Sequence, residues 1–142
     1  AAIDVVSEFI PEGVVMLERF GDGTEKQYTA QRGGLATQIP LVVLIDQGSA
    51  SASEIVAGAI QDRGRGQIVG AQSYGKGSVQ APHSLAGDGA IRVTIAKWLT
   101  PTGQWIHERG ITPDVAVERT PEDRAAGRDP QLDKALEVLA GP

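Results

Sequence analysis

The sequence predicts an α/β fold organised around one strand–helix–strand unit. The run Leu41–Ile45 is continuously apolar, which is typical of a parallel strand covered on both faces. Apolar residues then recur at helical spacing over 52–60, and Gly64 and Gly66 end that helix. A second short apolar run over 67–70 predicts the next strand. Strand, helix and strand over about thirty residues form a βαβ unit, whose crossover is almost always right-handed.

Further helices and strands are expected on both sides of this unit. Apolar residues at helical spacing predict a helix near the N-terminus, and a Gly–Asp–Gly–Thr turn predicts a hairpin after it. After the unit, apolar and polar residues alternate, which indicates a strand with one wetter face. In chain order, we expect a helix over 2–10, strands over 14–20 and 26–29, strands over 91–99, 105–107 and 114–118, a charged linker over 119–129, and a final amphipathic helix within 130–142.

Composition limits the classes of function. The chain has 142 residues, enough for one domain or part of one, and a net charge of −5. The negative charge argues against a nucleic-acid partner, because binding there depends on neutralising phosphates. The absence of cysteine excludes disulfides, thiolate nucleophiles and cysteine-based zinc sites. No apolar run is long enough to span a bilayer, and the first residues do not resemble a signal peptide.

Ser51 and Lys76 are the candidate catalytic pair. Ser51 follows the first strand of the unit and Lys76 follows the second, so both are expected at the same edge of the sheet, where α/β proteins bind ligands. Ser51 also lies where a helix begins, and the outward N–H groups there favour negative charge. Lysine acts as a base only when burial or cationic neighbours lower its pKa. Tyr74 and Val79 are expected to exclude water from Lys76, and Gln80 to orient it.

Each of these residues also has a structural explanation. Ser51 and Glu54 match the S-x-x-E capping box, and most such serines only cap a helix. A lysine between two glycines is more often a solvated turn residue, and Gln80 by itself reads as an exposed strand residue. Spacing also allows a Ser/His/Asp site made of Ser51, His107 and Asp46.

Two other functional motifs match the same unit only incompletely. The G-x-S-x-G elbow of α/β hydrolases is absent around Ser51, because Ser49 and Ser53 stand at the two glycine positions. Residues 70–76 match G-x-x-x-x-G-K, the start of a phosphate-binding loop. However, Gly77 stands where that loop needs a hydroxyl, and the following residues do not predict a helix.

Three segments together resemble the C-terminal-processing peptidases, also called tail-specific proteases. They are G-S-A-S-A-S-E-I at 48–55, Y-G-K-G-S-V-Q at 74–80 and G-I-T-P-D at 110–114, in the family's order. The resemblance implies a crotonase- or Clp-protease-like core and an endopeptidase that cleaves near protein C-termini, often behind apolar residues, without metal or other cofactor. It implies that Ser51 is the nucleophile, Lys76 the general base, Gln80 its support, and the Ala52 amide an oxyanion donor.

The resemblance also implies a division of the chain and a cellular location. Residues 1–118 correspond to the later part of the peptidase core, without the family's PDZ domain and the glycine-rich turn that supplies a second oxyanion donor. We therefore expect little activity from this chain alone, or a catalytically silent core that serves binding or assembly. Open sheet edges would favour dimerisation or strand exchange. Family members are commonly periplasmic, otherwise exported or membrane-anchored.

Overall fold

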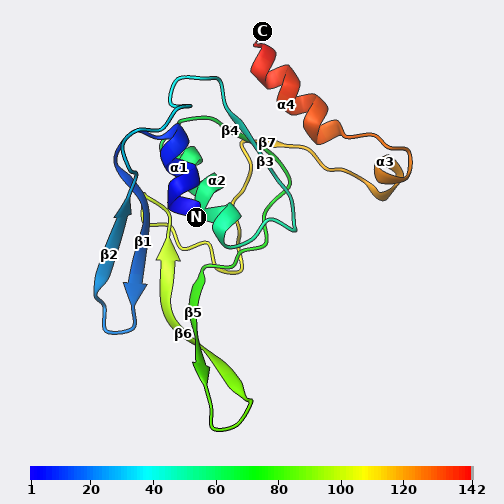
Figure 1. Cartoon of the computed structure of the whole chain (residues 1–142). Helices are drawn as coiled ribbons and strands as arrows, with labels where there is room; N and C mark the ends of the chain where they lie inside the picture. The colour runs from blue at the N-terminus through cyan, green and yellow to red at the C-terminus, as the bar shows by residue number, and fades with distance from the viewer. Residues whose placement is uncertain (142) are drawn as a thin grey trace.

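Helix α2 (Ala52–Asp62) packs against strands of two sheets in the computed structural model, which describes residues 1–141 (Figure 1). One sheet is antiparallel, with strand order β2-β1-β6-β5; the other is parallel, with order β3-β4-β7. The strands are β1 (Val14–Phe20), β2 (Glu25–Thr29), β3 (Val42–Ile45), β4 (Gln67–Gly70), β5 (Ser78–Ser84), β6 (Ala90–Leu99) and β7 (Val115–Ala116). The predicted α/β class is confirmed.

The βαβ unit forms as the sequence predicts. Strands β3 and β4 pair in parallel from Val42 opposite Gln67 to Ile45 opposite Gly70, and α2 connects them. The apolar face of α2 is buried against the sheets: Ala57, Ala59 and Ile60 are fully buried. Each large apolar side chain buried in this way stabilises the fold by roughly 1.5–3 kcal/mol. The unit is therefore the rigid frame on which both candidate catalytic loops are carried.

Helix α1 (Ala2–Phe9) and α2 pack side by side over the hydrophobic core (Figure 1). Arg65, just after α2, fastens the surrounding loops, because its guanidinium donates to the carbonyls of Phe9, Ala36 and Ile39 at 2.7–2.8 Å. The buried core comprises Val6, Ile10, Val15, Met16, Ile45, Ala57, Ala59, Ile60, Ile68, Trp98, Ile106 and Ile111.

Strands β5 and β6 form a hairpin that projects from the body of the protein (Figure 1). The hairpin register shifts between Val79 and Gln80, so the strand bends as it leaves the body. On β6, Ile91, Val93 and Ile95 are 40–47% exposed. Strands β2 and β5 are the edges of this sheet, and dimerisation or strand exchange through such edges stays a prediction.

One predicted strand is wrong and another is shorter than expected. Residues 105–107 form no strand; Trp105 instead donates from its indole Nε1 to the Gly77 carbonyl at 3.0 Å, and Ile106 accepts from Arg109 and Gly110 in a turn. The segment is thus held by side-chain and turn contacts that periodicity cannot reveal. Within the predicted strand 114–118, only β7 pairs with β4.

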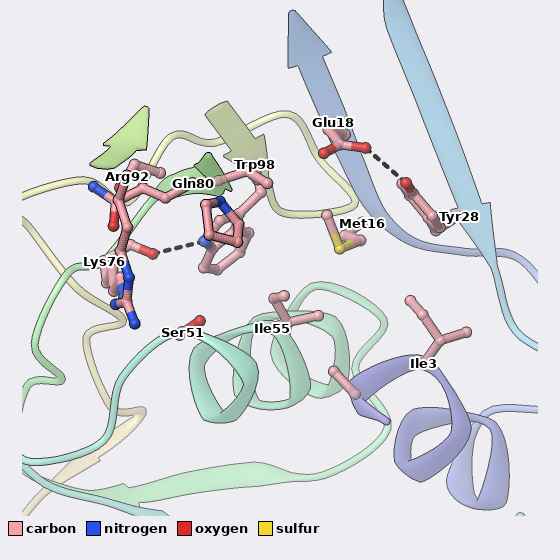
Figure 2. Close-up of a pocket in the computed structure, with 14 residues that line it drawn as sticks. Ile3, Met16, Glu18, Tyr28, Ser51, Ile55, Lys76, Gln80, Arg92 and Trp98 are labelled. Carbon is pink, nitrogen blue, oxygen red and sulfur yellow. Dashed lines mark hydrogen bonds between the residues drawn. The ribbon is translucent and has the colours of Figure 1, made fainter. Parts of the chain in front are cut away.

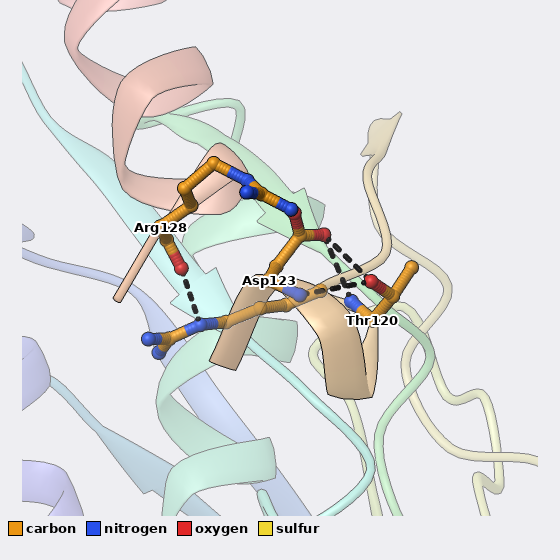
Figure 3. Close-up of polar contacts among 4 residues, drawn as sticks. Thr120, Asp123 and Arg128 are labelled. Carbon is orange, nitrogen blue, oxygen red and sulfur yellow. Dashed lines mark hydrogen bonds and ion pairs between the residues drawn. The ribbon is translucent and has the colours of Figure 1, made fainter. Parts of the chain in front are cut away.

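The C-terminal part contains more helix than expected. The stretch predicted as a charged linker, 119–129, includes the short helix α3 (Pro121–Ala125). Thr120 caps it, and Asp123 holds both the Thr120 hydroxyl, at 2.9 Å, and the Arg128 guanidinium, at 2.8 Å (Figure 3). The predicted final helix is confirmed as α4 (Pro130–Ala140), which packs on β3 and β4; Pro142 lies outside the described residues.

Candidate active site

Ser51 and Lys76 lie beyond the carboxyl ends of two neighbouring parallel strands. Ser51 follows β3 as the N-cap residue of α2, and Lys76 lies in the loop between β4 and β5. A backbone hydrogen bond of 2.9 Å from the Tyr74 amide to the Ser49 carbonyl joins the two loops directly. The topology therefore brings both residues to one edge of the sheet, as expected for a site in an α/β fold.

The backbone of Ser51 is strained. Its φ of 56° and ψ of −110° lie in a region that residues with a Cβ rarely adopt. The chain makes a sharp strand-to-helix turn here, which exposes the side chain at the start of α2. The G-x-S-x-G motif is absent, yet this conformation is of the kind that presents a nucleophile in α/β hydrolases. Its small neighbours, Ala50 and Ala52, suit so tight a turn.

The Ser51 hydroxyl makes no helix-cap hydrogen bond. Ser51 and Glu54 form a capping box, in which the Ser51 side chain faces the Glu54 amide without reaching hydrogen-bond geometry. Only the reverse bond is well formed, from the Ser51 amide to Glu54 Oε2 at 2.8 Å. The hydroxyl is therefore available for other chemistry, while the backbone of Ser51 is fixed by Glu54.

Glu54 joins the nucleophile turn to the lysine loop. Its side chain is fully buried, and its two oxygens accept four hydrogen bonds. Oε1 accepts from the Ser73 hydroxyl and the Gly75 amide, both at 2.6 Å; Oε2 accepts from the amides of Ser51, at 2.8 Å, and Lys76, at 2.9 Å. Ser73 Oγ in turn accepts from the Ile111 amide at 2.7 Å. One carboxylate thus fixes the backbones of both candidate catalytic residues.

The glycines beside Lys76 allow another loop to approach closely. Gly75 has φ +89°, and a Cβ there would lie 2.9–3.0 Å from the amide nitrogens of residues 108–110. A Cβ on Gly77 would lie 2.8 Å from the His107 amide nitrogen. On the other side, the indole of Trp98 donates to the Lys76 carbonyl at 2.7 Å. The backbone of Lys76 is therefore held between the loop of residues 107–110, which packs against Gly75 and Gly77, and the indole of Trp98.

Ser51, Lys76 and Gln80 line one cavity of about 550 Å³ (Figure 2). Its lining is mainly apolar, and Figure 2 shows Ser51 and Ile55 on α2 facing Lys76, Gln80 and Trp98 across it. An apolar cavity with a few polar groups at one side is the usual form of a site for an organic ligand. The other lining residues are Ala2, Ile3, Met16, Glu18, Tyr28, Ser78, Val79, Pro82 and Arg92.

The three candidate catalytic side chains line the same cavity but are not joined by hydrogen bonds. Among residues 1–141, no hydrogen bond joins the Ser51 hydroxyl, the Lys76 ammonium and the Gln80 amide. Lys76 is half-buried and Gln80 is exposed. Catalytic hydrogen bonds are often long without a substrate and tighten when it binds. Val79 lines the cavity as expected, but Tyr74 is 67% exposed, so the prediction that Tyr74 shields Lys76 is wrong.

Ala52 is placed to donate its amide. As the first residue of α2, it has no acceptor for its N–H within the helix. The amide lies directly after Ser51, where the helix dipole also favours negative charge.

The other sequence motifs fit the structure less well. In the described part of the chain, no hydrogen bond joins Ser51, His107 and Asp46; Asp46 accepts from the Gly48 amide at 2.9 Å, within its own turn. His107 Nδ1 is buried without a partner, and its ring stacks on Trp105. The Gly70–Lys76 segment leads into strand β5, whereas a phosphate-binding loop must open a helix.

The sequence does not reveal the roles of three polar residues at the site. It marks Glu54 only as the acid of a capping box, since local spacing carries no information on its contacts with residues 73–76. Ser73 is buried and relays the same network, but a serine in a loop gives no signal of this. Arg92 reads as an outward strand residue, and only the hairpin register brings it to the cavity.

The comparisons with known proteins identify the family. The sequence model of peptidase family S41 matches residues 1–117. The chain belongs to peptidase family S41.

Its curated relatives are consistent with that assignment. The chain is 41% identical to the carboxyl-terminal-processing protease of Synechocystis sp., over 99% of the chain and 34% of that protein. It is 44% identical to the carboxy-terminal-processing protease of Bartonella bacilliformis, over 92% of the chain and 30% of that protein. The S41 chain thus spans about a third of the length of these relatives.

A solved structure supports both the fold and the family. The photosystem II D1 C-terminal processing protease superposes with a TM-score of 0.77 at 35% identity, covering 82% of this chain and 30% of that one. Together with the sequence relatives, this confirms the resemblance to C-terminal-processing proteases that the three motifs indicate.

Proposed function

We propose that this chain carries the nucleophile and base of a serine endopeptidase. The observation that carries the proposal is the cavity shared by Ser51 and Lys76, with one buried carboxylate, Glu54, fixing both backbones. Preorganised groups of this kind are required when a weak nucleophile such as a serine hydroxyl must react. Membership of family S41 and the names of the relatives support the same activity.

The proposed reaction has two stages. Lys76 accepts the Ser51 hydroxyl proton as Oγ attacks the substrate carbonyl carbon, and the Ala52 amide stabilises the oxyanion. The C–N bond then breaks, and the lysine ammonium returns the proton to the departing amine. A water molecule, deprotonated by Lys76, then attacks the acyl carbon of the ester. The C–Oγ bond breaks, the lysine ammonium returns the proton to Ser51 Oγ, and the new C-terminus is released. Gln80 orients Lys76 throughout.

The cavity suggests which substrate side chain is bound. The cavity has an apolar surface next to Ser51, formed by Ile3, Met16, Ile55, Val79 and Trp98. We propose that it receives an apolar side chain of a protein tail, since burial of such a side chain contributes binding energy in proportion to its area. The relatives are named for processing at carboxyl termini, which supports a protein substrate of this kind.

Two further properties belong to the proposal. Hydrolysis by this chain alone is expected to be slow, because a single oxyanion donor, the Ala52 amide, is assigned in it. The protein is expected to act outside the cytoplasm, by its resemblance to exported peptidases; one relative, from Tetradesmus obliquus, is named as chloroplastic. In residues 1–141, no helix is long and apolar enough to cross a membrane.

Cleavage of an unfolded protein with an apolar tail tests the proposed function. The chain is assayed alone and in a chimera, in which it replaces the matching segment of the Synechocystis protease. We expect chimera activity that is lost in both Ser51→Ala and Lys76→Ala but retained in His107→Ala. Full activity in Lys76→Ala together with loss of activity in His107→Ala would show that His107, and not Lys76, is the general base. A folded but inert chimera would favour the alternative of a silent binding or assembly core.

A further inference from the structure

Arg92 brings a guanidinium to the cavity, separate from the proposed base. Within residues 1–141, the ionisable side chains that line this cavity are Glu18, Tyr28, Lys76 and Arg92. Glu18 is buried and accepts a hydrogen bond from the Tyr28 hydroxyl at 2.6 Å, so its side chain already has a hydrogen-bond partner. Arg92 is exposed, and no ion pair or side-chain hydrogen bond within residues 1–141 involves it. A guanidinium with all its donors available therefore faces the site.

The register of the hairpin explains why Arg92 reaches the cavity. Arg92 on β6 lies directly opposite Pro82 on β5, and Gln80 lies two residues before Pro82. Opposite residues of an antiparallel pair share a face, as do residues two apart on one strand. All three line the cavity, whereas the neighbours Ile91 and Val93 belong to the other face of β6. Figure 2 shows Arg92 and Gln80 reaching from the hairpin toward Lys76.

The cavity is therefore asymmetric. Apolar side chains of α1, β1 and α2 form one part, and the guanidinium stands at the part bordered by the hairpin, beside Gln80 and Lys76. A ligand that suits both parts has an apolar group with an anion close to it. The planar guanidinium fork matches the geometry of a carboxylate and binds it through two parallel hydrogen bonds.

We infer that Arg92 binds a carboxylate of the peptide substrate, adjacent to the residue whose apolar side chain enters the cavity. The inference rests on the proposed function and makes Arg92 a determinant of specificity. The carboxylate has two sources in a protein tail: the chain terminus itself, or an Asp or Glu side chain. Either one would be positioned by Arg92 while the apolar group occupies the surface near Ile55 and Trp98.

Peptide binding by the full chain carrying Ser51→Ala tests this inference without hydrolysis. Calorimetry compares three peptides that share one apolar sequence: a neutral amidated peptide, the same peptide with a free C-terminal carboxylate, and the amidated peptide with one Asp near its end. We expect one of the two anionic peptides to bind about three- to tenfold more tightly than the neutral peptide, and the difference to shrink in high salt. The preferred peptide identifies the source of the carboxylate.

Variants of Arg92 decide whether this residue is responsible. In the Ser51→Ala background, Arg92→Gln is expected to bind all three peptides equally, and Arg92→Lys to keep part of the preference. Arg32→Gln, which removes an exposed arginine outside the cavity, is the matched control and keeps the full preference. Equal binding of neutral and anionic peptides by the Ser51→Ala protein, or a preference that survives Arg92→Gln, would overturn the inference alone. Failure to bind any peptide would contradict the proposed function as well.

Discussion

The chain contains two helix starts with the same local pattern and different surroundings. Ser51 and Glu54 begin α2, and Thr120 and Asp123 begin α3; in both, a hydroxyl residue precedes an acid by three positions. Thr120 has an ordinary extended backbone, with φ −72°, and its hydroxyl accepts from the Asp123 amide at 3.1 Å. Ser51 has φ 56° and makes no such bond. Thr120 therefore caps α3 with its hydroxyl. At α2, Glu54 accepts a hydrogen bond from the N-cap amide, but the Ser51 hydroxyl makes no hydrogen bond to the helix.

The acids differ even more than the hydroxyls. Asp123 is near the surface and accepts hydrogen bonds from Thr120, in its own turn, and from Arg128 (Figure 3). Glu54 is fully buried and binds the loop that carries Lys76, more than twenty positions away in the chain. A capping box in a sequence therefore does not exclude a catalytic site: at α2 the same acid both starts the helix and links it to the second loop.

Removing the two hydroxyls gives the largest difference. Ser51→Ala is expected to lower peptidase activity by at least about a thousandfold, because the nucleophile is lost. It should leave the melting temperature nearly unchanged, since no cap bond is broken. Thr120→Ala should leave activity intact and weaken α3 by about 1 kcal/mol. Activity of the chimera and hydrogen exchange of the α3 amides measure the two effects. A Ser51→Ala protein that loses stability but keeps activity would make Ser51 a cap after all.

Substitution of the two acids, Glu54 and Asp123, is expected to give the next largest difference. Glu54→Ala leaves four donors in a buried region without their acceptor, which is expected to cost at least about 3 kcal/mol and can prevent folding. Glu54→Gln keeps the shape and is expected to cost about 2 kcal/mol, while lowering activity because Ser51 and Lys76 are less firmly placed. Asp123→Asn, the matched surface change, should cost much less than either Glu54 substitution, because the charge of Asp123 is screened by solvent. Urea unfolding compares the three; a Glu54→Gln protein as stable and active as the unsubstituted chain would contradict the proposed link.

Two glycines with positive φ allow a further comparison. Gly75→Ala introduces a Cβ 2.9 Å from the amide nitrogens of Arg109 and Gly110, so it is expected to displace the Lys76 loop and lower both stability and activity. Gly127, after α3, has φ +69° with open space around it. Gly127→Ala should therefore carry only the backbone strain of about 1–2 kcal/mol and no loss of activity. Equal effects of the two substitutions on activity would show that the close approach at Gly75 is unimportant.

The smallest expected effect is the acid sensitivity of the α3 start. The hydrogen bond from Arg128, followed by those from Thr120, holds the pKa of Asp123 below its ordinary value of 3.8. A lowered pKa in the folded state stabilises α3 fully above pH 3.8, and this contribution is lost as the pH falls through the lower folded value. Chemical shifts of the Asp123 carboxyl and the α3 amides follow the transition. Arg128→Gln should move the Asp123 midpoint upward; an unchanged midpoint would mean that Arg128 does not set it.

The sequence was sufficient for the frame of the site. Continuous apolar strands and a helix-spaced segment predicted the βαβ unit, and strand order then placed Ser51 and Lys76 at one edge. These features depend on local periodicity and on the rules of parallel sheets. The three motifs also indicated the peptidase family that the comparisons confirm.

What could not be predicted depends on contacts between distant segments. Trp105 lies where alternation suggested a strand, but its indole binds Gly77 and so holds the segment without a ladder. The roles of Glu54 and Ser73 require the β4–β5 loop to fold against α2. Arg92 depends on a hairpin register with a shift at Val79 and Gln80, which alternation alone does not locate.

Covalent labelling of Ser51 tests most directly whether Lys76 activates this serine. The chain and its chimera are treated with a fluorophosphonate, which reacts with activated serine hydroxyls, and the labelled residue is located by peptide mass mapping. We expect labelling at Ser51 that falls at least about a hundredfold in rate in a folded Lys76→Ala protein, while Thr120 and Ser53 stay unlabelled. Two results would contradict activation of Ser51 by Lys76. One is labelling of Ser51 at the same rate in Lys76→Ala as in the unsubstituted protein; the other is labelling of no serine in both the chain and its chimera.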